Sequence, residues 1–205
     1  MTSAHDAVTV ADLLAYPPEA AVEIVEGTIY LSRDGGFDVV DVDALPDDGR
    51  RHELVDGVIV LSPAPRRVHQ RGAFQLARLL ADAAPADLEI IMAPFDVDAG
   101  PKSQVEPDIL VLPREDRDGP VPPPLLAVEV LSPSNRGHDM LTKRNLYERI
   151  RVPSYWLVDP DEPAVTVLEL DDAGRYAEVA RTSGGASVSV ERPYPVTFRP
   201  VDLIR

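Results

Sequence analysis

The chain has 205 residues, of which 35 are acidic and 20 basic, so its formal net charge is -15. The absence of cysteine excludes a disulfide scaffold, a zinc–thiolate site and a thiol nucleophile. The length is typical of one domain with an appendage or of one larger domain.

Hydropathy and charge narrow the class further. No apolar stretch approaches the roughly 20 residues that a membrane helix requires. The N-terminal region has no basic residue before Arg33 and lacks the apolar run of a secretory signal. We therefore expect a cytoplasmic protein with no membrane partner. The acidity argues against broad, sequence-independent binding to nucleic acid, because that affinity comes from Lys and Arg residues that neutralise phosphates.

Two segments reverse the sign of the charge. Residues 63–83 contain four arginines and one aspartate, and residues 136–151 contain five basic and two acidic residues. Solvated helix faces often carry charges of either sign, so the pattern alone does not separate a binding surface from an ordinary one.

An internal repeat opens the chain. Residues 23–32, with the sequence EIVEGTIYLS, are similar to residues 53–62, with the sequence ELVDGVIVLS. In both, an acid and a glycine separate two short apolar strands, which predicts a tight hairpin. Two copies are too few for a solenoid. We interpret residues 1–36 as an added acidic hairpin segment, which either extends a sheet edge or covers the basic helices, and residues 37–205 as the main domain.

The next elements combine helices with strands. Apolar residues at helical spacing predict a helix over 67–83, whose packed stripe is Val68, Gly72, Leu76, Leu79 and Ala83. Runs rich in branched residues predict strands at 88–92, 105–112 and 125–131, and the proline-rich connector 113–124 indicates that the last two form an antiparallel pair.

A second helix is expected over 139–150, with Asp139 as its cap and Pro153 just past its end. Strands then follow at 154–158, 164–170 and 176–182. This order predicts a protein of the α/β (α+β) class, in which helices flank a mixed central β-sheet.

Two acids stand where apolar residues are expected. Asp108 opens an otherwise apolar strand, and Glu129 interrupts the apolar run 125–131. A buried carboxylate must pair with another group or bind a cation, because burying it alone is expensive. Two carboxylates on neighbouring strands form an oxygen pocket that suits magnesium or manganese. For each acid taken singly, a bond to backbone amides or to an arginine is the commoner outcome.

Lys143 is a third candidate. Of the 20 basic residues only Lys102 and Lys143 are lysines. In a chain with so strong a preference for arginine, a lysine can mark a place that needs a compact charge with a tunable pKa. An ordinary lysine on the solvent side of a helix is the alternative.

A series of short motifs follows a fixed order from about residue 47 to residue 170. The motifs are Glu53-Leu-Val-Asp-Gly57, Ser62-Pro-Ala-Pro65, His69, Glu106-Pro-Asp108, Val128-Glu-Val-Leu-Ser-Pro-Ser134, Asp139, Lys143, Tyr147 and Val152-Pro-Ser-Tyr-Trp-Leu-Val-Asp-Pro160. Together they resemble the Uma-two family of putative restriction endonucleases, which belongs to the PD-(D/E)XK nuclease superfamily. The resemblance implies a restriction-endonuclease-like fold with a mixed sheet between helices.

The resemblance also implies roles for individual residues. Asp108 and Glu129 would hold a magnesium or manganese ion, with the carbonyl oxygen of Val130 as a third ligand. The superfamily usually has a lysine two residues after the second acid, where this chain has Leu131. Lys143 matches the family lysine that fills this role from the following helix.

Further candidates are weaker. Glu53 and His69 match polar positions near the start of the family domain, and a histidine beside an apolar stripe is more often a hydrogen-bonded core residue.

The implied function is metal-dependent endonucleolytic hydrolysis of DNA. Four arginines would guide the phosphate backbone, namely Arg66, Arg67, Arg71 and Arg144. A homodimer is considered as well, since such nucleases often cut two strands with two subunits. The alternative is a non-catalytic nucleic-acid-binding or accessory module that retains the nuclease fold.

Overall fold

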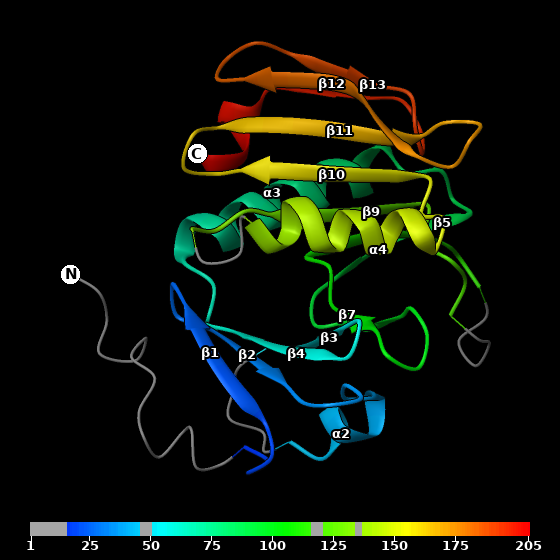
Figure 1. Ribbon diagram of the computed structural model, residues 1–205. Helices are drawn as coiled ribbons and strands as arrows, with labels where there is room; N and C mark the ends of the chain where they lie inside the picture. The colour runs from blue at the N-terminus through cyan, green and yellow to red at the C-terminus, as the bar shows by residue number, and fades with distance from the viewer. Residues whose placement is uncertain (1–15, 46–50, 116–120, 134–136) are drawn as a thin grey trace.

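The architecture was analysed in a computed structural model, which describes residues 16–45, 51–115, 121–133 and 137–205. These residues form two six-stranded sheets and a small two-stranded sheet. Figure 1 shows the first sheet in the lower half of the molecule and the second sheet, with its helices, in the upper half.

The first sheet is antiparallel and has the order β1-β2-β4-β3-β7-β6. The short helix α2 (Val39–Asp43) lies between its second and third strands in the chain. The strands are β1 (Ala21–Val25), β2 (Thr28–Ser32), β3 (Arg51–Val55), β4 (Val58–Ser62), β6 (Val97–Asp98) and β7 (Gln104–Val105).

Both repeated hairpins form, each beginning two residues earlier than the sequence repeat. Their turns place an acid and a glycine at positive φ, with 49° and 88° at Glu26 and Gly27 and 49° and 82° at Asp56 and Gly57. Positive φ at both central residues is the signature of a type I′ hairpin turn. Because β2 pairs with β4, the first hairpin extends the edge of the sheet, which was one of its two expected roles.

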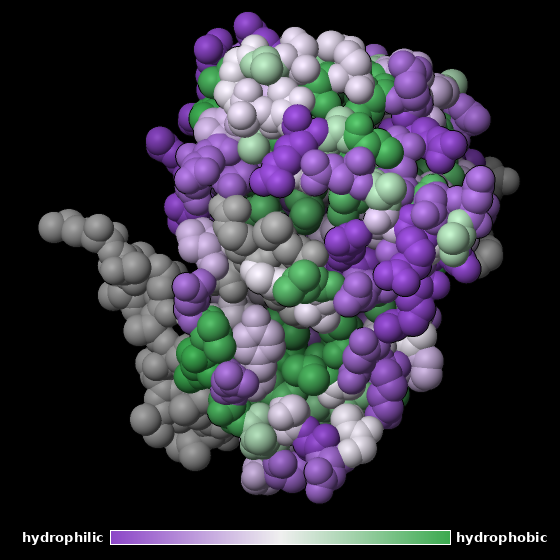
Figure 2. All heavy atoms as spheres, turned by 45° about the horizontal axis from the view of Figure 1, so that its top comes forward, coloured by the Kyte–Doolittle hydropathy of each residue, from purple (hydrophilic) through white to green (hydrophobic). Residues whose placement is uncertain are grey.

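The first sheet has its own core, formed by Tyr16, Ile29, Leu31, Phe37, Leu54, Ile59 and Leu61. The domain division at residue 36 stays a prediction. Apolar side chains also reach the surface of this part of the molecule, among them Val22, Ile24 and Val25 of β1, each 41–45% exposed. Figure 2 shows green, apolar surface mainly over this lower half, whereas purple, hydrophilic residues dominate above it.

The second sheet is mixed, as predicted, because β9 and β10 are parallel while its other neighbours are antiparallel. Its order is β12-β11-β10-β9-β8-β5. The strands are β5 (Leu88–Met92), β8 (Ile109–Pro113), β9 (Leu126–Val130), β10 (Ser154–Asp159), β11 (Ala164–Leu170) and β12 (Tyr176–Ser183), followed by β13 (Val188–Val190) and β14 (Val196–Phe198) of the two-stranded sheet.

The prediction of a single strand over 105–112 is wrong, because this segment contributes to two strands that belong to different sheets. β7 ends at Val105, and β8 begins at Ile109. Between them, Pro107 has no backbone N–H for a ladder, and the backbone N–H of Glu106 bonds instead to the Glu53 carboxylate at 2.8 Å. The chain passes here from the first sheet to the second, and this passage places Asp108 between the two.

Helix α3 (Arg67–Ala83) has the predicted bounds and packs on one face of the second sheet, behind it in Figure 1. The predicted stripe is confirmed at Gly72 and Leu76, which are buried, and at Leu79, which is partly buried against the same core. Val68 is half-buried, and the prediction is wrong at Ala83, which is exposed. The buried residues are His69, Gly72, Ala73, Leu76, Ala77 and Leu80. The buried face therefore includes His69, whose Nε2 atom lies 3.3 Å from the carboxylate of Asp108. The helix η2 (Pro200–Ile204) also packs against α3.

The second predicted helix has two parts on the opposite face of the sheet. A π-helix, η1 (His138–Lys143), leads into α4 (Arg144–Arg149). The predicted capping role of Asp139 concerns a side chain that lies outside the described residues. Lys143 stands where the winding changes, and Leu146 and Tyr147 are buried against the sheet. Within the described ranges, we find no helix of the length and apolarity needed to cross a membrane.

Candidate active site

The register of β8 and β9 places the two strand acids side by side. The strands are antiparallel, as predicted, and Ile109 pairs with Val128. Asp108 directly precedes β8 and Glu129 directly follows Val128, so the two acids are close enough for the charge of Asp108 to act on Glu129. Since side chains alternate along a strand, Glu129 belongs to the face whose core contains Leu146 and Tyr147 of α4.

Glu129 is held by the helix on this face. Its Oε1 atom lies 2.9 Å from Nζ of Lys143 and accepts a hydrogen bond from the hydroxyl of Tyr147 at 3.0 Å. Nζ of Lys143 also lies 2.8 Å from Oε1 of Glu53. Glu129 and Glu53 are each 1% exposed and Lys143 is fully buried, so Lys143 is not a solvent-side lysine.

Asp108 is held from three sides. The backbone N–H of Val130 donates to its Oδ2 atom at 2.7 Å, and NH1 of Arg51 donates to its Oδ1 atom at 3.0 Å. Nε2 of His69 lies 3.3 Å from Oδ2. His69 is buried, as a core histidine would be, yet it reaches the acid. Its Nδ1 atom has no hydrogen-bond partner among the described residues.

Arg51 is the residue that the sequence did not reveal. In addition to Asp108, its guanidinium lies 3.2 Å from Glu53, 3.6 Å from Glu129 and 3.9 Å from Glu106. The sequence held one signal: Arg51 and Glu53 are two residues apart on one strand and therefore share a face. The structure thus joins β3, β8, β9 and the helix that carries Lys143 in one charged cluster.

The positive groups of the cluster lower the pKa values of two of its acids. Burial acts to raise the pKa of Glu53, but the charges of Arg51 and Lys143 prevail and lower it to about 2. Burial likewise acts to raise the pKa of Asp108, and the His69 hydrogen bond and the Arg51 charge lower it to about 2. Both side chains are therefore carboxylates at neutral pH.

The pKa values of the other two acids of the cluster are raised. Burial raises the pKa of Glu129 in spite of the nearby lysine, and the neighbouring Asp108 carboxylate adds to the effect. Burial also raises the pKa of Glu106 to about 7. The pKa of Tyr147 is raised as well, by burial and by the Glu129 charge, so its hydroxyl remains a donor. The cluster contains more negative charge than its cations balance.

The chemistry of these donors fits a hard divalent cation. Carboxylate oxygens, such as those of Asp108 and Glu129, are the ligands that such ions prefer. The backbone N–H of Val130 donates to the Asp108 carboxylate. In an antiparallel ladder, the N–H and the C=O of one residue point to the same neighbouring strand. We therefore expect the carbonyl of Val130 to point toward Asp108 as well. Within the described ranges, no three His, Asp or Glu side chains already adopt a metal-binding arrangement.

Three of the predicted DNA-binding arginines lie at the start of α3. Arg66 precedes the helix and pairs with Asp161, while Arg67 is exposed. Arg71 is also exposed and donates to the carbonyl oxygen of Ile204 at 3.3 Å. Arg67 and Arg71 belong to the helix that brings His69 to the site, and Arg66 directly precedes it.

Arg144 is separate from this group. It lies on α4, directly after Lys143, and its NH2 atom donates to the carbonyl oxygen of Tyr176 at 2.9 Å. The structure therefore places it on the opposite face of the sheet, where it fixes β12 against the helix.

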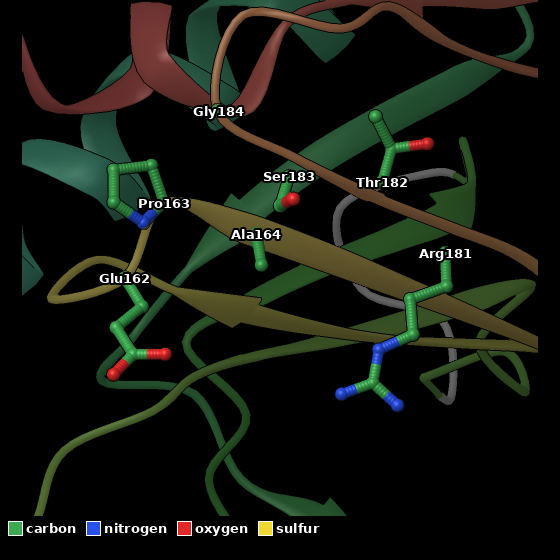
Figure 3. A pocket seen from close by; sticks show the side chains of 7 residues that line it. All are labelled: Glu162, Pro163, Ala164, Arg181, Thr182, Ser183 and Gly184. Carbon is green, nitrogen blue, oxygen red and sulfur yellow. The ribbon is translucent and has the colours of Figure 1, made fainter.

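A pocket of about 550 Å³ lies elsewhere on the second sheet. It is formed by the β10–β11 connection and the end of β12, and Figure 3 shows Arg181 and Glu162 on its sides. No predicted site residue lines it, so the charged cluster remains the candidate active site.

Comparisons with known proteins agree with this fold. A family model named Uma2, described as "Putative restriction endonuclease", matches residues 39–203. A solved structure from Anabaena variabilis, described as a putative nuclease belonging to DUF820, has a TM-score of 0.63 at 18% identity, covering 82% of this chain and 97% of its own. At that identity the likeness supports the restriction-endonuclease-like fold alone. No protein with a curated description matches the chain.

Proposed function

Since the chain belongs to the Uma2 (Uma-two) family of restriction-endonuclease-like proteins, we propose that it is a metal-dependent endonuclease that hydrolyses phosphodiester bonds of DNA. The observation that carries the proposal is the meeting of Asp108, just before β8, and Glu129 of β9 in one cluster with the buried ammonium of Lys143. Acids seldom meet in a buried cluster of this kind unless they have a function there, because burying several charges is costly.

The residues divide the work as follows. Asp108 and Glu129, with the Val130 carbonyl, would hold a magnesium or manganese ion, which when bound polarises a phosphoryl oxygen and lowers the pKa of a bound water. Lys143 holds Glu129 and Glu53 in place and supplies positive charge to the side where negative charge develops during hydrolysis. His69 fixes the orientation of Asp108.

DNA would approach along α3. Its exposed side carries Arg67, Arg71 and Arg78, which recur at helical spacing. Phe74 lies among them and is 57% exposed, an unusual exposure for an aromatic residue. Arginines can contact phosphates and an aromatic ring can stack on a base, so this face combines both means of binding a nucleic acid. Arg144 contributes less, since its side chain already bonds to β12.

The direct test is cleavage of plasmid and single-stranded DNA with and without magnesium or manganese. Asp108→Asn, Glu129→Gln and Lys143→Ala should each abolish metal-dependent cleavage. Lys102→Ala is the matched lysine control, because Lys102 is exposed and, within the described part of the chain, its ammonium bonds only to the carbonyl oxygens of Gly35 and Gly36. Unchanged cleavage in Asp108→Asn would refute the proposal.

One observation favours the alternative of a non-catalytic module that binds nucleic acid. In this structure Arg51 and Lys143 already pair with the carboxylates that would bind the metal. Isothermal titration calorimetry with manganese chloride separates the two functions. A folded protein that binds DNA and no manganese would be an accessory module, whereas manganese binding that Asp108→Asn removes supports the enzyme.

A further inference from the structure

Arg51 occupies the position that a bound cation would take. NH1 lies 3.0 Å from Asp108, and NH2 lies 3.6 Å from Glu129, the two acids proposed as metal ligands. The same NH2 atom is 3.2 Å from Glu53. One guanidinium therefore contacts carboxylates of β3, of β9 and of the segment just before β8, and with 17% of its side chain exposed it lies on the outer side of a buried cluster.

The charge balance explains why an arginine is there. Without Arg51, the carboxylates of Glu53, Asp108 and Glu129 would share Lys143 as the one buried cation among the described residues, with His69 beside one of them. Like charges at such separations repel strongly in a poorly hydrated interior. The guanidinium is suited to this task, because its planar fork serves several carboxylate oxygens at once and it stays charged.

Arg51 and a divalent ion cannot hold these oxygens together. Magnesium binds carboxylate oxygens at about 2.0–2.1 Å, so an ion shared by Asp108 and Glu129 would meet the guanidinium nitrogens that already contact both. The two are also like charges. Binding of the ion therefore requires the side chain of Arg51 to move away.

We propose that Arg51 is the resident counter-ion of the metal-free site, which keeps the carboxylates assembled and which the divalent cation must displace. This inference rests on the proposed metal-dependent function. It assigns Arg51 as a positioning residue with two opposed effects: it stabilises the protein without metal, and it weakens metal binding.

The test measures manganese binding and thermal unfolding, with no DNA present. Arg51→Met removes the charge and keeps most of the stem. It should lower the melting temperature without metal and bind manganese more tightly, on the order of tenfold, since a competing charge at about 4 Å has gone. Arg51→Lys keeps the charge without the fork and should fall between the wild type and Arg51→Met in both measurements. Arg149→Met is the matched control, because Arg149 pairs with the exposed Asp56 outside the cluster.

The outcomes are decisive in each direction. Manganese that binds Arg51→Met as weakly as the wild type, or more weakly, overturns the inference and leaves the metal site intact. If neither protein binds manganese, both this inference and the proposed function fail. Should Arg51→Met unfold without metal, manganese is added to the unfolded variant. Recovery of the fold near the concentration that half-saturates the wild type supports the role of Arg51, and lack of recovery contradicts it.

Discussion

Nζ of Lys143 lies 2.8 Å from Oε1 of Glu53, so a lysine on the helix of the second sheet holds a carboxylate of the first. The same atom lies 2.9 Å from Glu129 in the second sheet. One ammonium thus ties the two sheets together at the candidate active site. The stability of the protein and the geometry of the site consequently depend on the same residue.

Replacing Lys143 by methionine should lower the free energy of unfolding by about 3–5 kcal/mol, because it leaves two buried carboxylates with one cation fewer. Urea unfolding followed by circular dichroism measures the change. Lys102→Met is the control and should stay within about 0.5 kcal/mol of the wild type, as expected for an exposed side chain.

A second substitution tests why Lys143→Met should lose stability. If the loss in Lys143→Met comes from the unpaired Glu129 carboxylate, then Glu129→Gln in the same chain should restore part of it, since the neutral amide needs no counter-ion. Losses that simply add in the double variant would point to altered packing instead.

Substitutions at two buried tyrosines distinguish effects on the candidate site from effects on the core, because only one of the two contacts a site residue. Tyr147 donates to Glu129 at 3.0 Å, and Tyr176 donates to the carbonyl oxygen of Val152 at 2.7 Å. Each substitution by phenylalanine should lower the free energy of unfolding by about 1–2 kcal/mol, because each leaves a buried acceptor with one donor fewer.

The two variants should differ in metal binding. Tyr147→Phe alone should change the manganese affinity measured by calorimetry, since only its hydroxyl contacts a proposed ligand. Equal affinities in Tyr147→Phe and Tyr176→Phe would argue against Glu129 as that ligand.

The two hairpins, although similar in sequence, should respond differently to the same change. Gly27 and Gly57 both have positive φ, at 88° and 82°. A Cβ atom on Gly27 would meet nothing within 4 Å, whereas one on Gly57 would lie 3.1 Å from Cα of Gly36. Gly27→Ala should lower the free energy of unfolding by about 1 kcal/mol through backbone strain alone.

Gly57→Ala should lower it by at least about 1 kcal/mol more, because the contacting atom belongs to the backbone and cannot rotate away. Thermal unfolding of both variants gives the comparison. Similar melting temperatures would mean that the loop carrying Gly36 shifts freely, contrary to this expectation.

Local patterns in the sequence were enough to locate most of the second sheet and two of its acids. Asp108 and Glu129 were visible because an apolar strand tolerates a carboxylate only for a reason, and the rarity of lysine indicated Lys143. The break at Pro107 was missed, since apolar residues on both sides of it read as one strand. The change of sheet there depends on a hydrogen bond from Glu106 to Glu53, which no local pattern encodes.

The role of Arg51 could not be predicted from local sequence patterns either. Its role arises from contacts with Asp108 and Glu129, which belong to another sheet and lie far along the chain. A sequence shows the residues of each strand, but the approach of one sheet to the other is settled by packing over the whole fold.

The last prediction concerns alkaline pH and Tyr194. Its hydroxyl donates to the carbonyl oxygen of Leu80 at 2.8 Å and joins the β13–β14 hairpin to α3. Burial raises the pKa of Tyr194 to about 12, above the usual 10. The folded protein therefore keeps the phenol proton at pH values where the unfolded chain has lost it. The stability that this group contributes is complete below pH 10 and is lost as the pH rises to about 12.

Urea unfolding of the wild type and of Tyr194→Phe at a series of pH values should show the variant as less stable at pH 8. The difference should shrink above pH 10, because only the wild type has this proton to lose, and a difference that stayed constant with pH would contradict the assignment.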